Sequence, residues 1–541
     1  MPFPFRRFVS NASASLLTLA GTSPPIPDQP PQGQPILAEL DLEKLAALAK
    51  QWVTACRTTH KLCTSTVSDA SQPFPTRLLD VDAGDPSVII LRRWSLGAQG
   101  RYVALSHCWG LSQPSKTTKS TLSSHCQGMT VTALPKTFSD AVRVVRSLGM
   151  RYLWIDSLCI VQDDQDDWRR EAAMMSDIYA NAYLTMYAAH STSCDSGFLE
   201  GRAPDPIVKM PQQRLDPSFY ISVRHIFSDD IDKSNLASRA WVIQKKILSP
   251  RTLHFTATQV YWECWTRHQG EDLDDSYLGS FKQDAYPKML APGGQSPDEL
   301  ANHTPSQWWY LLSSYTACHL TYQKDKLIAI SGLMNRISQV TSKKHVAGIF
   351  EDRLHEGLLW SNSGRPFERV TEIRFPSWSW ASRKGRIDYV QLYQWAVNDD
   401  VQLMEPHTDT TAILKAKMCR LKSAVDIGSI ADSTEYNDFP PELDYPPTSF
   451  RSVAPGWLDD EGHLGWLTID EDKDEVVDML HIGWVIVACN LNKANEDHIT
   501  ESPLYCVLVR SVVNNTYERI GIGAVQDLSW FEEVKEDKMI I

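Results

Sequence analysis

The chain has 541 residues, a formal net charge of −13 and 43% hydrophobic residues, and this length predicts two or three domains rather than one compact core. The hydrophobic share is typical of a soluble globular protein. A free-standing nucleic-acid-binding protein is usually basic, so the acidic balance argues against a nucleic-acid partner. No apolar run reaches the ~18 residues that a membrane-spanning helix needs, so no membrane span is expected.

The first 36 residues are expected to form a disordered tail that ends in a Pro-rich linker, "SPPIPDQPPQGQP" at Ser23–Pro35. Two arginines and several serines near the start also fit a weak transit peptide, which we favour less. The 11 cysteines are an odd number, and no CxxC pair occurs. In a chain of this length that pattern indicates reduced intracellular thiols, and we expect a cytoplasmic protein.

Residues 37–100 are expected to contribute a helix and strands that pack on the following domain. "LAELDLEKLAALAKQWVTAC" has apolar residues at helical spacing, whereas "PTRLLDV" and "SVIILRRW" read as strands. A strand at "YVALS" follows, then an amphipathic helix at "LPKTFSDAVRVVRSLG". A strand over Met150–Val161, a helix at "DDQDDWRREAAMMSDIYANA" and a strand at "YLTMYAA" complete a β-α-β-α-β alternation. This order predicts a parallel sheet with helices on its faces.

Polar side chains follow two of these strands. In such sheets ligands bind beyond the carboxyl ends of the strands. The first strand delivers "SHCWG" to that edge, and the second delivers "DSLC". The residues placed there are Ser106, His107, Cys108, Trp109 and Gly110 after the first strand, and Asp156, Ser157 and Cys159 at or near the end of the second.

The rest of the chain has a different composition. Residues 240–335 mix strands and helices, and short strands separated by charged loops dominate from about Pro376. We therefore divide the chain into a tail and linker (1–36), an approach segment (37–100), an α/β domain (101–265), a mainly helical region (266–375) and a β-rich region (376–541).

Three long motifs resemble one known family. "RYVALSHCWG", the block from "LPKTF" to "TMYAA", and "SRAWVIQKKILSPRTLHFTATQVYWEC" (Ser238–Cys264) resemble, in order and spacing, the fungal heterokaryon incompatibility (HET) domain. The resemblance makes 101–265 a HET domain and implies non-self recognition between fungal individuals, ending in programmed cell death. It also implies protein partners and an assembly of several copies. HET domains are distantly similar to TIR domains, so we expect a flavodoxin/TIR-like parallel sheet flanked by helices, followed by an α+β and β-rich C-terminal region.

Some TIR domains cleave NAD+ with a glutamate, and the resemblance therefore nominates site residues. Ser106, His107, Trp109 and Gly110 would line a nucleotide pocket, where Gly110 permits close backbone approach and Trp109 stacks on a ring. Trp109 plugging the core and His107 as a core histidine are the competing interpretations. Asp156 would bind a ribose or base, or cap a turn. The remaining ligand-binding candidates are Cys159, Gln162, Arg239, Trp241 and Gln244.

The candidate catalytic carboxylates are Glu171 and Glu263. Glu171 lies beside the apolar face of its helix, and we favour structural pairing with Arg169, Arg170 or Arg239 over catalysis. The family usually has Trp-x-x-Gln-Glu in its closing block, whereas this chain has Lys245 after Gln244. A lysine cannot act as the carboxylate of a glycohydrolase, because its positive charge opposes an oxocarbenium-like centre. Glu263 would substitute only if the fold brings it near.

The spacing C-x3-H-x2-C at Cys56, His60 and Cys63 brings together three zinc-type ligands. No fourth ligand lies nearby in the sequence and the segment continues a helix, so we expect packing and no metal site. No cofactor is expected either, although NAD+ remains a candidate substrate. The function hypotheses are thus a HET protein in cell-death signalling, a TIR-like NAD+ glycohydrolase, and an accessory protein or repurposed enzyme of fungal specialised metabolism.

Overall fold

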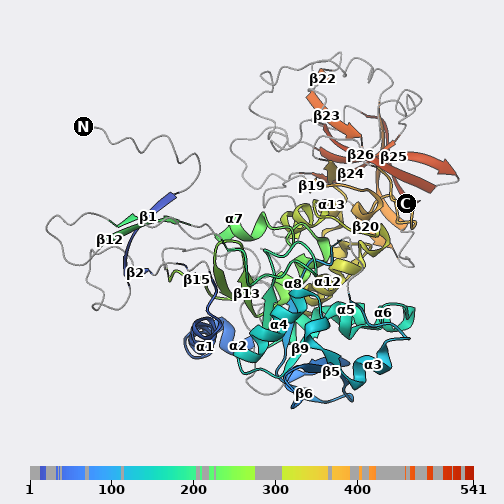
Figure 1. The fold of residues 1–541 in the computed structure, drawn as a ribbon. Coiled ribbons are helices and arrows are strands. Elements are labelled where there is room, and N and C mark those ends of the chain that lie inside the picture. Colours follow the sequence, from blue (N-terminus) through green and yellow to red (C-terminus); the bar gives the residue numbers. More distant parts are fainter. Residues whose placement is uncertain are drawn as a thin grey trace, which may run out of the picture. The chain divides into compact units, whose positions relative to one another are not determined.

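The computed structural model divides the chain into two compact units, Met1–Ser296 and Pro297–Ile541, shown in Figure 1 and described separately below. The residues it describes are 13–19, 32–33, 36, 39–66, 72–110, 115–202, 208–209, 219–224, 227–273, 308–362, 368–389, 401–404, 413–421, 457–458, 464–469, 484–490, 504–513, 516–525 and 531–541. The expected boundaries at 265 and 375 remain predictions.

The first unit is built on a nine-stranded sheet with the order β15-β14-β13-β10-β7-β9-β4-β5-β8. Its four central strands are parallel, and the strands outside them are antiparallel. The bounds are β4 Arg77–Asp80, β5 Val88–Arg93, β7 Val103–Ser106, β8 Met129–Thr130, β9 Tyr152–Ile155, β10 Leu184–Tyr187, β13 Arg251–Phe255, β14 Val260–Cys264 and β15 His268–Gly270.

The predicted β-α-β-α-β alternation is therefore confirmed for the centre of the sheet, but the sheet as a whole is mixed. Short connections account for three of the antiparallel pairings, because residues 81–87 between β4 and β5, 256–259 between β13 and β14, and 265–267 between β14 and β15 are too few for a crossover. Strands β7, β10 and β13 are buried along their whole lengths, which requires cover on both faces of the sheet.

Helices supply that cover, with α1 packed against α4 and α6 against α8. Local signals set where they begin: the Asp41 carboxylate accepts from the first backbone amides of α1, and Asp164 does the same for α6. The bounds are α1 Leu42–Thr59, α2 Lys61–Thr66, α3 Leu122–Gln127, α4 Lys136–Ser147, α5 Asp156–Cys159, α6 Gln165–Asn181, α7 Phe227–Asp232 and α8 Ala240–Leu248.

The strand expected over Met150–Val161 is shorter than predicted. It ends at Ile155, and the next four residues form the short helix α5. The Asp156 carboxylate accepts a hydrogen bond from the Ser157 amide at 2.8 Å, at the start of that helix. Polar residues of "DSLC" therefore lie in a helical turn above the sheet edge.

A smaller four-stranded sheet in the same unit has the order β11-β12-β1-β2. It joins β1 (Ser13–Leu19) and β2 (Gln32–Gly33) to β11 (Val208–Lys209) and β12 (Phe219–Arg224). Strand β1 lies in the segment expected to be a disordered tail, and its pairing with β12 supplies its backbone with hydrogen-bond partners. Among the described helices, none has both the length and the apolar character needed to cross a membrane.

The second unit combines a helical part with a β-rich part. Residues 308–316 are helical, followed by α12 (Ile328–Thr341) and α13 (Leu354–Gly357). Trp308, Trp360, Trp378 and Trp380 are among its largest fully buried side chains. Short strands pair as β16 (His345–Val346) with β17 (Ile349–Phe350), and β18 (Trp360–Asn362) with β19 (Ile387–Tyr389).

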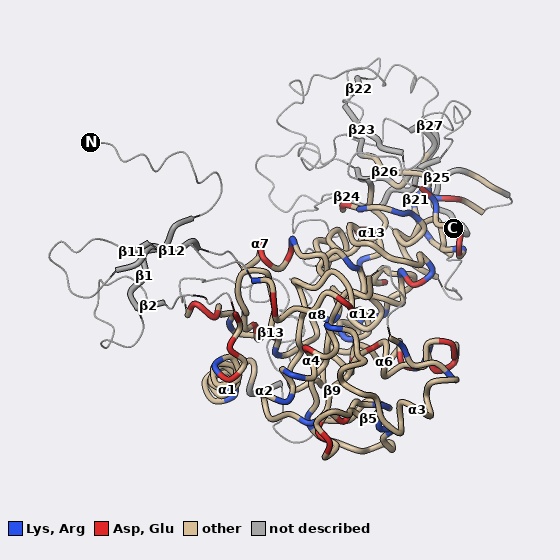
Figure 2. The backbone as a smooth tube through the Cα atoms, in the orientation of Figure 1, with Lys and Arg blue, Asp and Glu red and all other residues tan. Residues whose placement is uncertain are grey.

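The expected β-rich C-terminal region is an eight-stranded sheet with the order β20-β21-β24-β25-β26-β23-β22, in which β27 pairs with β21 and β26. Its strands are β20 Val401–Met404, β21 Ile413–Leu421, β22 Trp457–Leu458, β23 Leu464–Ile469, β24 Trp484–Asn490, β25 Leu504–Val513, β26 Thr516–Val525 and β27 Phe531–Ile540. Figure 2 shows basic and acidic positions interspersed along the described backbone of each unit.

Candidate functional site

The strand order places the site. From β7 the chain moves to β9 on one side, and then returns to β10 on the other side of β7. Such a reversal is the topological switch point where ligands bind in α/β sheets, beyond the carboxyl ends of the strands. The residues that follow β7 and β9 lie at this edge, as the sequence predicted.

Asp156 is the centre of this edge. Its Oδ2 accepts a hydrogen bond from Lys245 Nζ at 2.9 Å, and its Oδ1 accepts one from Trp109 Nε1 at 3.1 Å. Asp156 is only 6% exposed and Lys245 only 4%. The loop after β7, the start of α5 and helix α8 therefore meet in one buried polar network. We call Asp156, Trp109, Lys245, His107 and Arg239 the Asp156 cluster.

Within this cluster the charges of Asp156 and Lys245 are paired. Burial alone would raise the pKa of Asp156, but the Lys245 ammonium, with smaller effects of His107 and Arg239, outweighs burial and lowers it to about 2. Asp156 is thus ionised at neutral pH and fully engaged with hydrogen-bond donors. Lys245, which stands where the family resemblance suggested a glutamate, fits here because it neutralises a carboxylate. The next residue, Lys246, likewise pairs with Asp232 at 2.8 Å.

His107 is the second titratable group of the cluster. Its Nδ1 lies 4.0 Å from Asp156 Oδ1, and its ring meets Phe138 edge-on at 5.0 Å between centroids. Burial lowers its pKa to about 4, so the imidazole is neutral at pH 7. Arg239 Nη1 donates to the His107 carbonyl oxygen at 3.1 Å and ties α8 to the end of β7.

Several buried polar atoms at this edge have no hydrogen-bond partner within the described ranges. They include both ring nitrogens of His107 and the side-chain oxygens of Ser106, Ser157 and Gln244. Buried polar atoms in folded proteins are nearly always paired with protein, water or a ligand. These atoms are therefore the polar groups of this edge whose hydrogen-bonding capacity the described part of the protein leaves unused.

Two candidate ligand-binding residues, Trp109 and Gly110, make contacts within the protein. The indole N–H of half-buried Trp109 donates to Asp156, and Gly110 approaches the loop after β10. Gly110 has φ +80°, and a Cβ there would lie 2.6 Å from the Ser193 Cβ. Glycine is required at this position by its backbone conformation and by the close contact with Ser193.

Three further candidates lie on α5, just after it and on α8. Gln162 Nε2 donates to the backbone carbonyls of Asp156 and Ile160, which secures α5. Burial raises the pKa of the Cys159 thiol to about 12, so it stays protonated. Trp241 meets Trp168 edge-on at 6.5 Å.

Glu171 lies outside the Asp156 cluster in a different ionic group. It is fully buried on α6, 3.7 Å from Arg77 and 3.8 Å from Arg170, and Arg77 also bonds to Asp167. The expected pairing with Arg170 is thus present, whereas Arg77, on β4, was not foreseen. Burial raises the pKa of Glu171.

Glu263 is not brought to the Asp156 cluster either. It lies on β14, where its carboxylate bonds to His254 Nε2 at 2.8 Å. The sheet order puts four strand spacings between β14 and β9, about 19 Å laterally. The geometry thus assembles Asp156, Trp109, His107, Arg239 and Lys245, but neither candidate glutamate.

Residues 102–245 match the family model described as Heterokaryon incompatibility protein (HET). The match begins at β7 and ends at Lys245, so it contains every member of the Asp156 cluster. No curated protein matches the chain, and no solved structure does.

Proposed function

We propose, from the premise that residues 102–245 are a HET domain, that this protein acts in non-self recognition between fungal individuals and signals the death of the fused cell. The observation that supports this proposal is the family match, which spans the whole central parallel part of the sheet except β13. The Asp156 cluster supports a binding and signalling role over catalysis, because its carboxylate is already neutralised by a lysine.

The Asp156 cluster would then hold α5, α8 and the end of β7 of the signalling domain in place. Its ion pair joins α5 to α8, and Arg239 joins α8 to the end of β7. Partners that recognise this edge would bind a surface whose shape depends on those two links. Loss of the ion pair should therefore weaken signalling even when the abundance of the protein in the cell is unchanged.

The test is inducible expression of the full chain in a filamentous fungus, with growth and membrane integrity as readouts. We expect growth arrest and cell death from the parent chain, and a weaker response from Lys245→Met at matched protein abundance. Lys233→Met is the control, since the Lys233 side chain is 75% exposed and pairs with exposed Asp229. Normal growth of cells with abundant parent protein, alone or beside candidate incompatible partners, would refute the proposal.

NAD+ hydrolysis is the second candidate, and the strand order favours it. The central strands run β9-β7-β10-β13, which in chain order is 2-1-3-4, the start of the flavodoxin-like order 2-1-3-4-5. Polar atoms of Ser106, His107 and Ser157 that have no hydrogen-bond partner among the described residues lie at its switch point. These features support nucleotide binding at this edge.

NAD+ turnover by the purified protein at high concentration decides this second candidate. Glu171→Gln, Glu263→Gln and Asp156→Asn should be measured beside the parent. Turnover lost in one of these variants, with its fold intact by circular dichroism, would name the essential carboxylate. An inactive parent at all concentrations would dismiss NAD+ as the substrate and leave the signalling proposal standing.

A further inference from the structure

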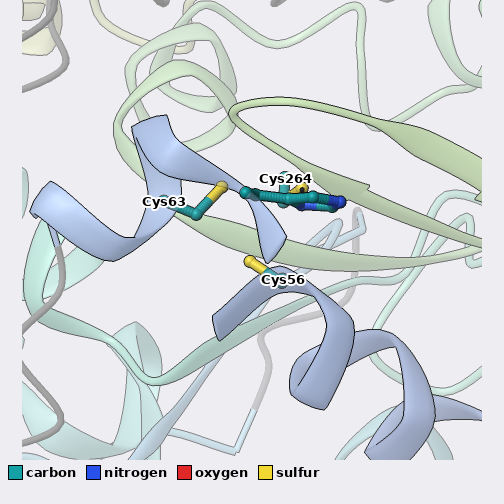
Figure 3. Close-up of side chains that lie close together, drawn as sticks. Cys56, Cys63 and Cys264 are labelled. Carbon is teal, nitrogen blue, oxygen red and sulfur yellow. Dashed lines mark hydrogen bonds between the residues drawn. The ribbon is translucent and has the colours of Figure 1, made fainter. Parts of the chain in front are cut away.

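Four metal-type ligands converge in the first unit, away from the Asp156 cluster in the sequence. The side-chain ligand atoms of Cys56, His60, Cys63 and Cys264 all lie within 4.8 Å of one another. The three cysteines are buried and the histidine is half-buried. Figure 3 shows the sulfur atoms of Cys56 and Cys63, on two helices, directed toward Cys264 on a strand.

The local fold explains how the C-x3-H-x2-C spacing produces this geometry. Cys56 lies in the last turn of α1, His60 is the extended residue between the helices, and Cys63 lies in α2. The break at His60 turns the chain so that three side chains meet, which a continuous helix over the same residues would not do. Cys264, 204 residues after His60, closes the group from the end of β14.

The contacts within the group are those of a preformed ligand set. Cys264 Sγ lies 3.3 Å from His60 Nδ1, and Cys63 Sγ lies 3.5 Å from Thr266 Oγ1. A tetrahedral zinc ion with Zn–S bonds of ~2.3 Å holds its sulfur ligands about 3.8 Å apart, so small side-chain adjustments suffice to bind the ion. Thr266 can donate a hydrogen bond to a bound thiolate, as the groups around zinc ligands commonly do.

We propose that Cys56, His60, Cys63 and Cys264 bind a structural zinc ion that fastens the N-terminal helices to the edge of the sheet. Three thiolates and one imidazole are a complete tetrahedral set, which leaves no coordination position for a substrate. Soft sulfur ligands select zinc over magnesium or calcium, which prefer oxygen. This site is a revision of our expectation from the sequence, in which the fourth ligand was missing.

Neighbouring contacts fit a fastening role. Trp52 of α1 donates its indole N–H to Gln269 Oε1 at 2.9 Å, and its ring stacks on Trp262 of β14 at 6.1 Å between centroids. The ion would thus reinforce an interface that already joins α1 to β14 and β15. It would also close a loop that contains the entire matched segment 102–245, which restricts the unfolded chain.

The test is the metal content of the full-length protein, purified without chelator and measured by inductively coupled plasma mass spectrometry. We expect about one zinc ion per chain. Cobalt bound in its place should give the intense visible bands and thiolate charge-transfer bands of a tetrahedral sulfur-rich site. Cys264→Ser and Cys56→Ser should lose most of the zinc, whereas Cys126→Ser, at an exposed cysteine, should keep it.

Three results would overturn the proposal. One is a folded parent protein that contains no zinc and gives no tetrahedral cobalt spectrum, a measurement that needs no variant to fold. Another is zinc that stays at parental stoichiometry in both Cys264→Ser and Cys56→Ser. The third is a disulfide between Cys56 and Cys63 in the native protein by non-reducing peptide mapping. None of these results depends on growth arrest or NAD+ turnover.

Discussion

The positive charge of the Lys245 side chain stabilises the buried carboxylate of Asp156. Lys245→Met would leave Asp156 charged and buried without its cation, and we expect the free energy of unfolding to fall by about 3–5 kcal/mol. Chemical denaturation measures this loss. The double variant Asp156→Asn with Lys245→Met should lose less than the sum of the two single variants, because it removes both charges together.

The same ion pair predicts that Lys245→Glu, which would introduce the glutamate usual in the family, destabilises the fold. It would place a second carboxylate beside Asp156, where like charges repel in a buried site. We expect it to be at least as destabilising as Lys245→Met. Equal stability of Lys245→Glu and the parent would mean that Lys245 and Asp156 are not paired in solution.

Because His107 is buried as a neutral imidazole, we expect the free energy of unfolding to fall in mild acid. Its pKa falls from 6.5 in the unfolded chain to about 4 in the fold, so the unfolded state binds the proton first as the pH is lowered. The stability that neutral His107 contributes is therefore complete above pH 6.5 and lost between pH 6.5 and 4. The full loss is on the order of 3 kcal/mol.

The readout is the difference between the parent and His107→Gln in denaturation curves across that pH range. Burial also lowers the pKa of His125 and His268, and the parent and His107→Gln share those contributions to the pH dependence. The parent should lose more stability than His107→Gln between pH 6.5 and 4. Parallel pH profiles would show that His107 titrates normally and is not buried in solution.

At the scale of elements, the loop after β7 depends on one glycine. Gly110→Ala places a Cβ at a positive φ and against Ser193, so we expect a loss of about 2–4 kcal/mol. Gly84→Ala is the matched control, because Gly84 has φ +97° and no described residue beyond its chain neighbours lies within 4 Å of the added Cβ. It should cost about 1–2 kcal/mol, from backbone strain alone. Equal losses at the two positions would mean that the loop after β10 does not pack on Gly110.

At the scale of the molecule, the two compact units should respond separately to local damage. Gly348 of the second unit has φ +90°, and an added Cβ would lie 2.5 Å from Trp380 Nε1. We expect Gly348→Ala to speed amide hydrogen exchange in β18 and β19 and to leave β7, β9 and β10 unchanged. Hydrogen exchange with mass spectrometry measures this by peptide. Faster exchange throughout both units would show that they unfold as one.

Local patterns in the sequence were sufficient for the central elements. The alternation of β7, α4, β9, α6 and β10 follows from hydrophobic periodicity and from caps such as Asp164, which act within a few residues. The same patterns placed Trp109, His107 and Asp156 at a shared edge. The HET resemblance likewise rests on contiguous motifs, and it covers the segment that the family model matches.

Only the tertiary structure decided what those residues contact. Strand direction at the sheet flanks, the pairing of Asp156 with Lys245, the pairing of Glu171 with Arg77 and the arrival of Cys264 beside Cys56 and Cys63 all join distant segments. Periodicity and capping report each segment's own conformation, whereas pairing of charges and ligands depends on which segments the sheet order brings together. The sequence thus determined the elements and the residues at their ends, and the fold determined which of those residues became partners.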